Sequence, residues 1–388
     1  MKRFTALTLA LFVLFALCSC KKSPAPVATN PTETTTPTEA TEPSATTPSV
    51  PQQPMVAVSV PVVTEREKAG DGKEIFYYSY QNMSLTLPEP EVAEKVILDF
   101  LNKADLQATA EGIRKAAITA HEQNGGLDYP YFCSSLYTPS RVDRGVLSLS
   151  GTCVIFEGGA HGSTVATSAS YDLLTGNALT WKDILQSGVT GEQISALVLE
   201  ALDSYEEKEY LFIDYADTVK SIFSQGLQHH TSWYFTDSAL CCYFSPYEIG
   251  PFSLGTVAAR IPYEKLVGIL KDEYFPPERD LVDGTVIAEA FDPEKLSAFT
   301  QMAEIVLDGG GRKLLVSADT MVYDVRVETG SMTKNGESFI PEYTVLGAAT
   351  LTPGDAIMID LPGIDSENAI RITYTSGGET QTLIPTLS

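Results

Sequence analysis

Three glycines surround one histidine in Phe156-Glu157-Gly158-Gly159-Ala160-His161-Gly162-Ser163-Thr164, a segment that lies between two strand-like runs. Such spacing indicates a backbone that bends where side chains would obstruct it. The next run ends in a tight turn at Ser170-Tyr171-Asp172-Leu173-Leu174-Thr175-Gly176-Asn177. We expect a binding loop here, formed by Gly158, Gly159, His161, Gly162 and Asp172.

Outward from this loop, strands and helices follow one another without a regular βαβ alternation. Two strand-like runs at 131–137 and 146–156 turn around Asp143-Arg144-Gly145, and apolar residues at helical spacing follow Pro88. Thr180 with Asp183 and Thr190 with Gln193 predict capped helix starts, and residues 263–271 predict a closing helix. The pattern predicts an α+β fold with a mainly antiparallel sheet and packed helices.

A second block strengthens a family resemblance. It runs Tyr243-Phe244-Ser245-Pro246-Tyr247-Glu248-Ile249-Gly250-Pro251-Phe252, continues through Gly255, and ends at Arg260-Ile261-Pro262-Tyr263. With the Gly-Gly-Ala-His-Gly loop, it resembles the RsiV-like extracellular domain family over about residues 73–275. That family includes the ectodomain of a lysozyme-sensing anti-sigma factor and the accessory domain of PdaC-type peptidoglycan deacetylases. The resemblance implies an RsiV-like fold and makes Pro246, Tyr247 and Gly255 its second motif.

The amino terminus is typical of an exported lipoprotein. Lys2-Arg3 precedes a short apolar run that ends at Leu17-Cys18-Ser19-Cys20. Residues 1–20 therefore predict a lipoprotein signal peptide, with lipid attached to Cys20 and the chain held on the extracytoplasmic face of the cell membrane. An ordinary secretory signal with incidental cysteines is the alternative.

Composition divides the rest of the chain into a tether, a head, a linker and a carboxyl-terminal part. Residues 21–72 are rich in proline and threonine and predict a disordered tether, with 55–73 as its continuation or a loose first strand. Pro276-Pro277 opens a predicted exposed linker at 276–284 between the head, residues 73–275, and the carboxyl-terminal part. Short strands separated by turn signals then predict a small all-β sandwich at 285–388, with an immunoglobulin-like arrangement as one form.

The chain is strongly acidic. It carries 50 acidic and 26 basic residues, for a net charge of −24. Such a chain is not expected to bind nucleic acid and should attract cationic partners, although acidity can also serve solubility alone. Between Glu192 and Glu248 only Lys208 and Lys220 are basic, and the outer side of the helix after Thr190 should be negative.

The remaining histidines and cysteines allow few site hypotheses. His161 is either a binding-site imidazole or a structural one, and His229-His230 lack further residues at zinc-ligand spacing. His121 lies near a predicted helix end, where a cation suits the helix dipole. Cys133 and Cys153 lie on paired strands and could form a disulfide, whereas one of Cys241 and Cys242 should be buried and the other partly exposed.

No catalytic motif is visible in the sequence. Neither a cofactor nor a metal is predicted. The leading hypothesis is a non-catalytic head that binds a lysozyme-like or other cationic protein, or cell-wall material. The second hypothesis is an accessory component of a peptidoglycan-modifying system. The third is a hydrolase that uses His161 with a nearby acid such as Asp172.

Overall fold

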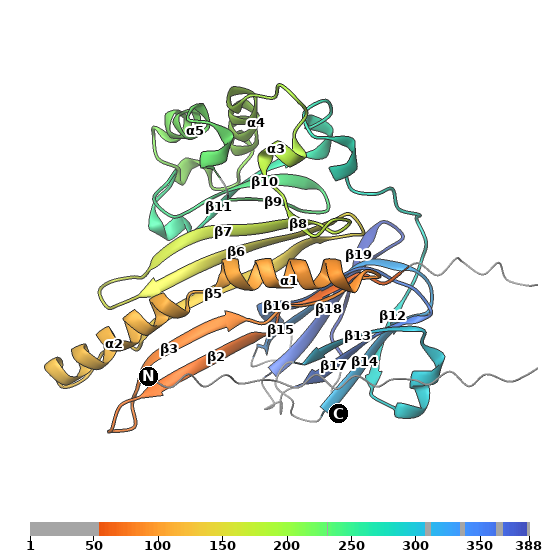
Figure 1. Cartoon of the computed structure of the whole chain (residues 1–388), viewed down its shortest axis with the longest axis horizontal. Helices are drawn as coiled ribbons and strands as arrows, with labels where there is room; N and C mark the ends of the chain where they lie inside the picture. Colours follow the sequence, from red (N-terminus) through yellow and green to blue (C-terminus); the bar gives the residue numbers. More distant parts are fainter. Residues whose placement is uncertain (1–53, 231, 307–311, 334–337, 362–367, 386–388) are drawn as a thin grey trace, which may run out of the picture. The chain divides into compact units, whose positions relative to one another are not determined.

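The computed structural model describes residues 54–230, 232–306, 312–333, 338–361 and 368–385. The predicted signal peptide and Cys20 lie outside these ranges. Residues 54–388 belong to one compact unit with four sheets, in which most strand pairs are antiparallel (Figure 1). The predicted mixture of helices and mainly antiparallel sheets is therefore confirmed. No helix of the described ranges is both long and apolar enough to cross a membrane.

The first sheet and its two helices follow the predicted pattern. Its strand order is β2-β3-β5-β6-β7-β8, and only β3 and β5 pair in parallel. One face is covered by the apolar sides of α1 and α2, through Val96, Phe100 and Ile113 (Figure 1). The elements are β2 (Val62–Lys68), β3 (Glu74–Gln81), α1 (Pro90–Ala104), α2 (Gln107–Asn124), β5 (Tyr131–Val142), β6 (Val146–Phe156), β7 (Ser163–Asp172) and β8 (Asn177–Ala178).

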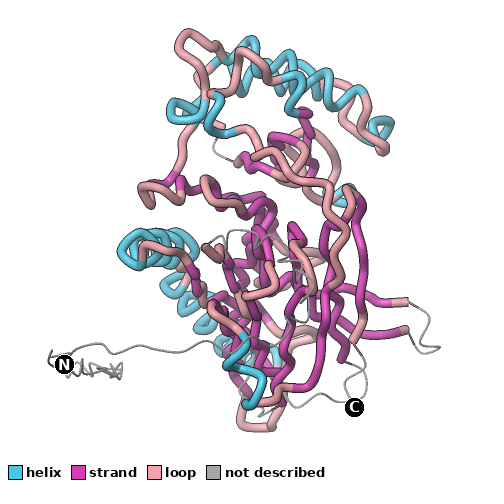
Figure 2. Tube along the Cα trace, turned by 90° about the vertical axis from the view of Figure 1, so that its right-hand side faces the viewer, coloured by secondary structure: helices cyan, strands magenta, loops and turns pink. Residues whose placement is uncertain are grey.

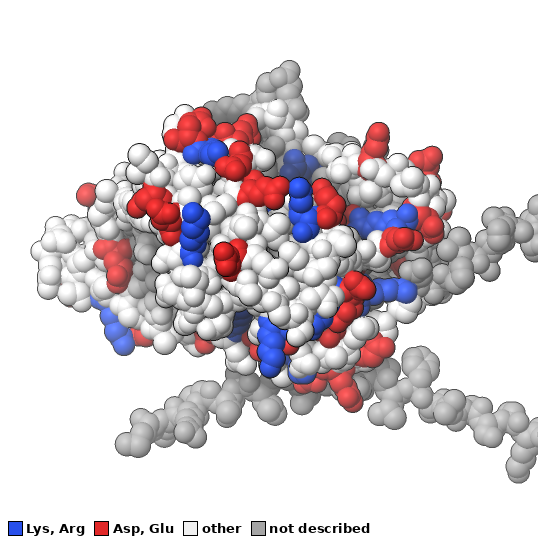
Figure 3. Space-filling model, turned by 90° about the horizontal axis from the view of Figure 1, so that it is seen from above, with Lys and Arg blue, Asp and Glu red and all other residues white. Residues whose placement is uncertain are grey.

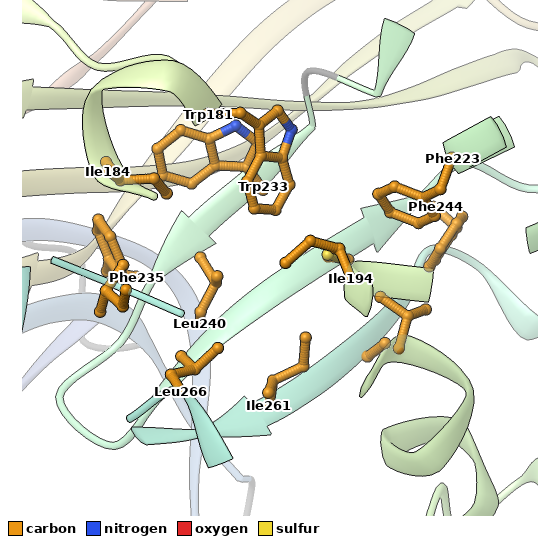
Figure 4. Packing of buried hydrophobic residues seen from close by; sticks show 14 of the residues in the cluster. Trp181, Ile184, Ile194, Phe223, Trp233, Phe235, Leu240, Phe244, Ile261 and Leu266 are labelled. Atoms are coloured by element: carbon orange, nitrogen blue, oxygen red, sulfur yellow. The ribbon is translucent and has the colours of Figure 1, made fainter. Parts of the chain in front are cut away.

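A second, three-stranded sheet contacts strands β6 and β7 and carries the largest core of the head (Figures 2 and 4). Trp181, Ile194, Phe223 and Phe244 pack together there, which buries the apolar stripes of the surrounding helices. The predicted caps at Thr180 and Thr190 are both present. The elements are α3 (Trp181–Ile184), α4 (Gly191–Asp203), α5 (Tyr215–Ser224), β9 (Trp233–Phe235), β10 (Ala239–Phe244) and β11 (Val257–Pro262).

The predicted closing helix is wrong. Residues Tyr263–Lys265 form one 3₁₀ turn, and a second lies at Asp272–Tyr274. Gly268, whose φ is +78°, interrupts the segment between them. Its positive φ is incompatible with a continuous right-handed helix.

The carboxyl-terminal strands form two sheets that share one hydrophobic core. One sheet has the order β12-β14-β17-β13, and the other has the order β19-β18-β15-β16-β1-β4. Besides β1 (Ala57–Ser59) and β4 (Ser84–Thr86), the strands are β12 (Val286–Ala290), β13 (Gln301–Val306), β14 (Arg312–Ala318), β15 (Val322–Met332), β16 (Phe339–Leu351), β17 (Asp355–Leu361), β18 (Asn368–Ser376) and β19 (Glu379–Leu383).

This sheet order corrects two predicted boundaries. Strand β1 pairs with β16 on one side and with β4 on the other, so residues before position 73 are an integral part of the fold. Val58 and Val60 are fully buried there. Residues 54–72 are therefore not part of a tether, and the carboxyl-terminal sheets are not confined to residues 285–388.

The segment 276–284 is largely exposed, as predicted, but it is not a linker with few contacts. Arg279 forms ion pairs with Asp324 and Asp237, which bring the segment against β15 and the turn between β9 and β10. The Gly284 N–H donates to Ser376 Oγ at 2.8 Å. These long-range contacts hold the segment although its prolines and acidic residues resemble a linker.

Candidate functional site

The glycine-rich loop is shaped by a close approach of backbones. Residues 157–162 connect β6 to β7, and Gly158 and Gly159 have φ values of +94° and +92°. A Cβ atom on Gly162 would lie 2.6 Å from the Ile155 carbonyl oxygen. Glycine at these positions lets the loop turn tightly and present His161 to solvent.

The two blocks singled out in the sequence meet at His161. Its ring stacks on Phe252, with ring centroids 4.1 Å apart and an interplanar angle of 19°. Its Nε2 lies 3.2 Å from the Tyr247 hydroxyl, and its Nδ1 lies 2.9 Å from the Gly162 carbonyl oxygen. Both ring nitrogens thus have polar neighbours although the side chain is exposed, and the imidazole joins the two loops.

The second loop holds Tyr247 in an unusual conformation. Tyr247 has a φ of +71°, which is uncommon for a residue with a side chain. Its N–H donates to the Gly250 carbonyl oxygen at 2.9 Å, and the Ser245 N–H donates to the Glu248 carboxylate. Gly255 also has a positive φ of +69°. Pro246 is partly buried beside Tyr247. The turn leaves the tyrosine 58% exposed.

Asp172 does not belong to this site. It lies at the far end of β7, nine residues beyond the strand's start at Ser163, and strands rise about 3.3 Å per residue. Its carboxylate accepts bonds from the Leu174 N–H and the Thr175 hydroxyl, which fixes the following turn. The hypothesis of a hydrolytic pair between His161 and Asp172 is therefore wrong in its geometry.

An apolar segment extends the site beyond the predicted residues. Ile213 is fully exposed, Tyr210 is 59% exposed, and Phe212 donates its N–H to the Ile249 carbonyl oxygen at 3.0 Å. This bond fixes the segment to the loop of Tyr247. We use the name loop surface for His161, Tyr210, Phe212, Ile213, Tyr247 and Phe252. A short apolar run among acidic residues is the sequence signal that marks residues 210–213.

Exposed acidic side chains flank the apolar segment 210–213 in sequence, and Glu248 directly follows Tyr247. The acids predicted to face outward on and after α4 are exposed, while Val198 and Leu202 are buried. Lys208, Lys220 and Lys265 each pair with one of these acids, so most of the negative charge in the described part of this segment stays uncompensated. Figure 3 looks down on the side of the molecule that carries α4 and α5, and there acidic side chains outnumber basic ones. The exposed acids of residues 192–248 are Glu192, Glu200, Asp203, Glu206, Glu207, Glu209, Asp214, Asp217 and Glu248.

The other candidate groups are placed apart from this site. The described residues include no group of three or more His, Cys, Asp or Glu side chains placed to hold a metal. His121 is in the last turn of α2, and His229 is exposed while His230 is buried.

The four cysteines of the described ranges are free. Cys133 lies opposite Ile155, and Cys153 lies opposite Ser135. The two cysteines are therefore diagonal neighbours on one face rather than a directly opposed pair. Contrary to expectation, Cys241 and Cys242 are both buried, because the two faces of β10 pack into different clusters. Burial raises the pKa of Cys241 to about 11 and that of Cys133 to about 12.

Burial of His230 should make the stability of the folded protein depend on pH. Its ring lies between Phe223 and Phe244, and burial lowers its pKa to about 4. Between about pH 6.5 and pH 4 the unfolded chain binds a proton that the folded chain does not. The stability should therefore fall by about 3 kcal/mol as pH decreases through this window.

Urea unfolding at several pH values measures this contribution. The variant His230→Phe should flatten the pH dependence in this window, whereas His229→Phe, which changes the exposed neighbour, should keep it. Equal pH slopes for the two variants would show that His230 is not the group responsible.

Comparison with known proteins finds a family similarity over part of this site. Residues 182–264 match the family described as protein of unknown function (DUF3298). A crystal structure of a DUF3298 member from Bacteroides fragilis NCTC 9343 has 15% identity and a TM-score of 0.43, with 56% of this chain and 94% of that chain covered. A DUF3298 protein from Pseudomonas aeruginosa PAO1 has 17% identity and a TM-score of 0.42, with coverages of 57% and 97%. No curated protein matches the chain.

The matched residues include α4, α5, the apolar segment 210–213 and the loop of Tyr247. The glycine-rich loop that contacts Tyr247 and Phe252 lies before them in sequence. Residues 182–264 of this chain are therefore similar to the DUF3298 family.

Proposed function

We propose that this protein is a cell-surface lipoprotein with an RsiV-like head that binds a cationic protein, such as a lysozyme, without catalysis. The observation that carries the proposal is the loop surface, which combines exposed apolar side chains with exposed acids that neighbour them in sequence. Large apolar anchors supply most of the binding energy at protein interfaces, and tyrosine is enriched among them. Ile213 and Tyr247 project from loops that hydrogen bonds hold in place.

Charge determines the class of partner. Acidic groups around an apolar centre favour a partner whose apolar patch is rimmed by lysine and arginine. Complementary charge raises the association rate and excludes acidic partners. The sequence resemblance to a lysozyme-sensing ectodomain agrees with this chemistry and makes lysozyme the probe of choice.

Surface plasmon resonance with immobilised lysozyme tests the electrostatic part. Raising the salt from 0.1 M to 1 M shortens the Debye length from about 10 Å to about 3 Å. We expect the association rate constant to fall about tenfold or more, and the dissociation rate constant to change less.

The paired variant Glu206→Gln/Glu207→Gln should reduce the association rate constant, while Glu122→Gln on α2 should not. Binding that is insensitive to salt and to both variants would contradict the electrostatic mechanism. An absence of binding at low salt would exclude lysozyme as the partner.

Anchoring through Cys20 completes the proposal. A signal peptide that ends at a lipoprotein-type cysteine supports it, and a diacyl group supplies the two chains that stable attachment requires. The variant Cys20→Ala should move the protein from the membrane fraction to the soluble fraction. Continued recovery with membranes would contradict lipid anchoring at this residue.

A further inference from the structure

A cleft distant in sequence from the loop surface lies between the β2–β3 hairpin and the carboxyl-terminal sheet. Its volume is about 510 Å³, which is within the range of small-ligand sites. Strands β2 and β3 form one wall, and β15, β16 and β18 form most of the other. We infer that this cleft binds a neutral oligosaccharide.

One wall offers hydroxyl groups on a fixed framework. Thr64 and Ser79 line it, and their hydroxyl oxygens lie 2.9 Å apart across β2 and β3. A hydroxyl both donates and accepts, so this pair can exchange its mutual bond for bonds to the hydroxyls of a ligand. Arg66 lies on the same wall, where Glu74 holds its guanidinium through two contacts of 2.8 Å.

The first wall is also stiffened by stacked rings. Tyr77 stacks on Phe132 with ring centroids 4.8 Å apart, and Phe132 stacks on Phe156 at 5.6 Å. The Arg66 guanidinium lies over the other side of Tyr77, 5.6 Å from its centroid. The ring of Tyr77 is therefore fixed in orientation, and Tyr77 lines the cleft beside the two hydroxyl groups.

The opposite wall supplies an apolar surface. Tyr343 is half-buried there, and Val345 and Ile370 form a buried base beside it. Tyr343 packs against the core of the carboxyl-terminal sheets and stays partly exposed in the cleft lining, so the exposed part of its ring can contact a ligand. Glu342 is exposed next to it and adds a carboxylate acceptor.

The ligand class follows from this combination. Arg66 and Glu342 are the charged residues of the cleft lining, so the cleft is close to neutral although the chain has a net charge of −24. It therefore does not select cations as the loop surface does. A pyranose ring presents an apolar face of C–H groups and an equatorial rim of hydroxyls, which matches an aromatic wall opposite a hydroxyl-bearing wall.

Titration calorimetry of residues 54–388 with chitotetraose and with maltotetraose tests the inference. The first probe represents glycans built on N-acetylglucosamine, as in cell walls, and the second represents glucose polymers. Binding of either probe supports a saccharide site and identifies its source. Failure of both probes to bind at millimolar concentrations, or preferential binding of an extended peptide, would overturn the inference.

Two variants locate the site. Thr64→Val removes one hydroxyl at constant shape and should weaken saccharide binding about fivefold to tenfold. Tyr343→Leu keeps an apolar side chain but removes the ring, and should weaken it further. The matched control Thr138→Val lies on β5 outside the cleft and should leave the affinity unchanged. Thermal unfolding confirms that each variant is folded, and equal affinity of all three for the saccharide would overturn the assignment.

Discussion

The substitution Arg141→Met should lower the free energy of unfolding by about 3 to 5 kcal/mol, the cost of breaking a buried ion pair. Arg141 is only 2% exposed. Its Nε donates to Asp143 Oδ2 at 2.6 Å, and its Nη1 donates to the Tyr274 carbonyl oxygen at 2.6 Å and the Tyr263 hydroxyl at 2.9 Å. Its Nη2 also donates to the Phe275 carbonyl oxygen at 3.2 Å, so methionine would leave one buried carboxylate oxygen and two carbonyls without these donors.

Arg144→Met is the matched control for this effect. Arg144 lies in the same turn but is exposed, so its replacement should change the stability by less than about 0.5 kcal/mol. Urea unfolding monitored by tryptophan fluorescence measures both, since Trp181 and Trp233 lie in the core of the head. Equal midpoints for the two variants would show that Arg141 does not hold the hairpin to residues 263–275.

A chain that begins at residue 73 should not fold cooperatively, whereas one that begins at residue 54 should. The shorter chain lacks both β1 and β2, which leaves the pairing edges of β16, β4 and β3 exposed to solvent. It also lacks Val56, Val58 and Val60, which are at most 3% exposed. Complete burial of one valine stabilises by about 1.5 to 3 kcal/mol, so their loss alone approaches the total stability of a typical domain.

Circular dichroism during thermal unfolding distinguishes the two chains. We expect a single sharp transition for residues 54–388, and a broad transition or aggregation for residues 73–388. A sharp transition at the same temperature for both would mean that the head and the carboxyl-terminal sheets fold without β1 and β2.

Local features of the fold could be predicted because they depend on nearby residues. The capping pairs at Thr180 and Thr190, the turn at Asp143 and the apolar stripe of α1 each lie within a short window. The pairing of β1 with β16 could not be predicted, because about 290 residues separate Ala57 from Ala348. The contacts of segment 276–284 could not be predicted for the same reason, because Asp324, an ion-pair partner of Arg279, is remote in sequence. Its proline and acidic residues alone are typical of a linker.

The candidate site was predicted in part. The two motif loops were identified, and the structure brings His161 against Tyr247 and Phe252. Asp172 does not lie at the site where the sequence predicts it. The alternation of residues along a strand shows which face each side chain is on, but not that the two ends of β7 lie far apart. Ile213 was missed, since its exposure depends on the way the turns between α4 and α5 pack.

The affinity of loop-surface variants for lysozyme at low salt tests the central claim most directly. The claim predicts that Ile213→Ser and Tyr247→Ser each weaken binding about tenfold or more, as the loss of an interface anchor does. Leu98→Ser on α1, where the side chain is 55% exposed, should bind like the unmodified protein. Unchanged affinity in both loop-surface variants, or an equal loss in Leu98→Ser, would contradict the claim.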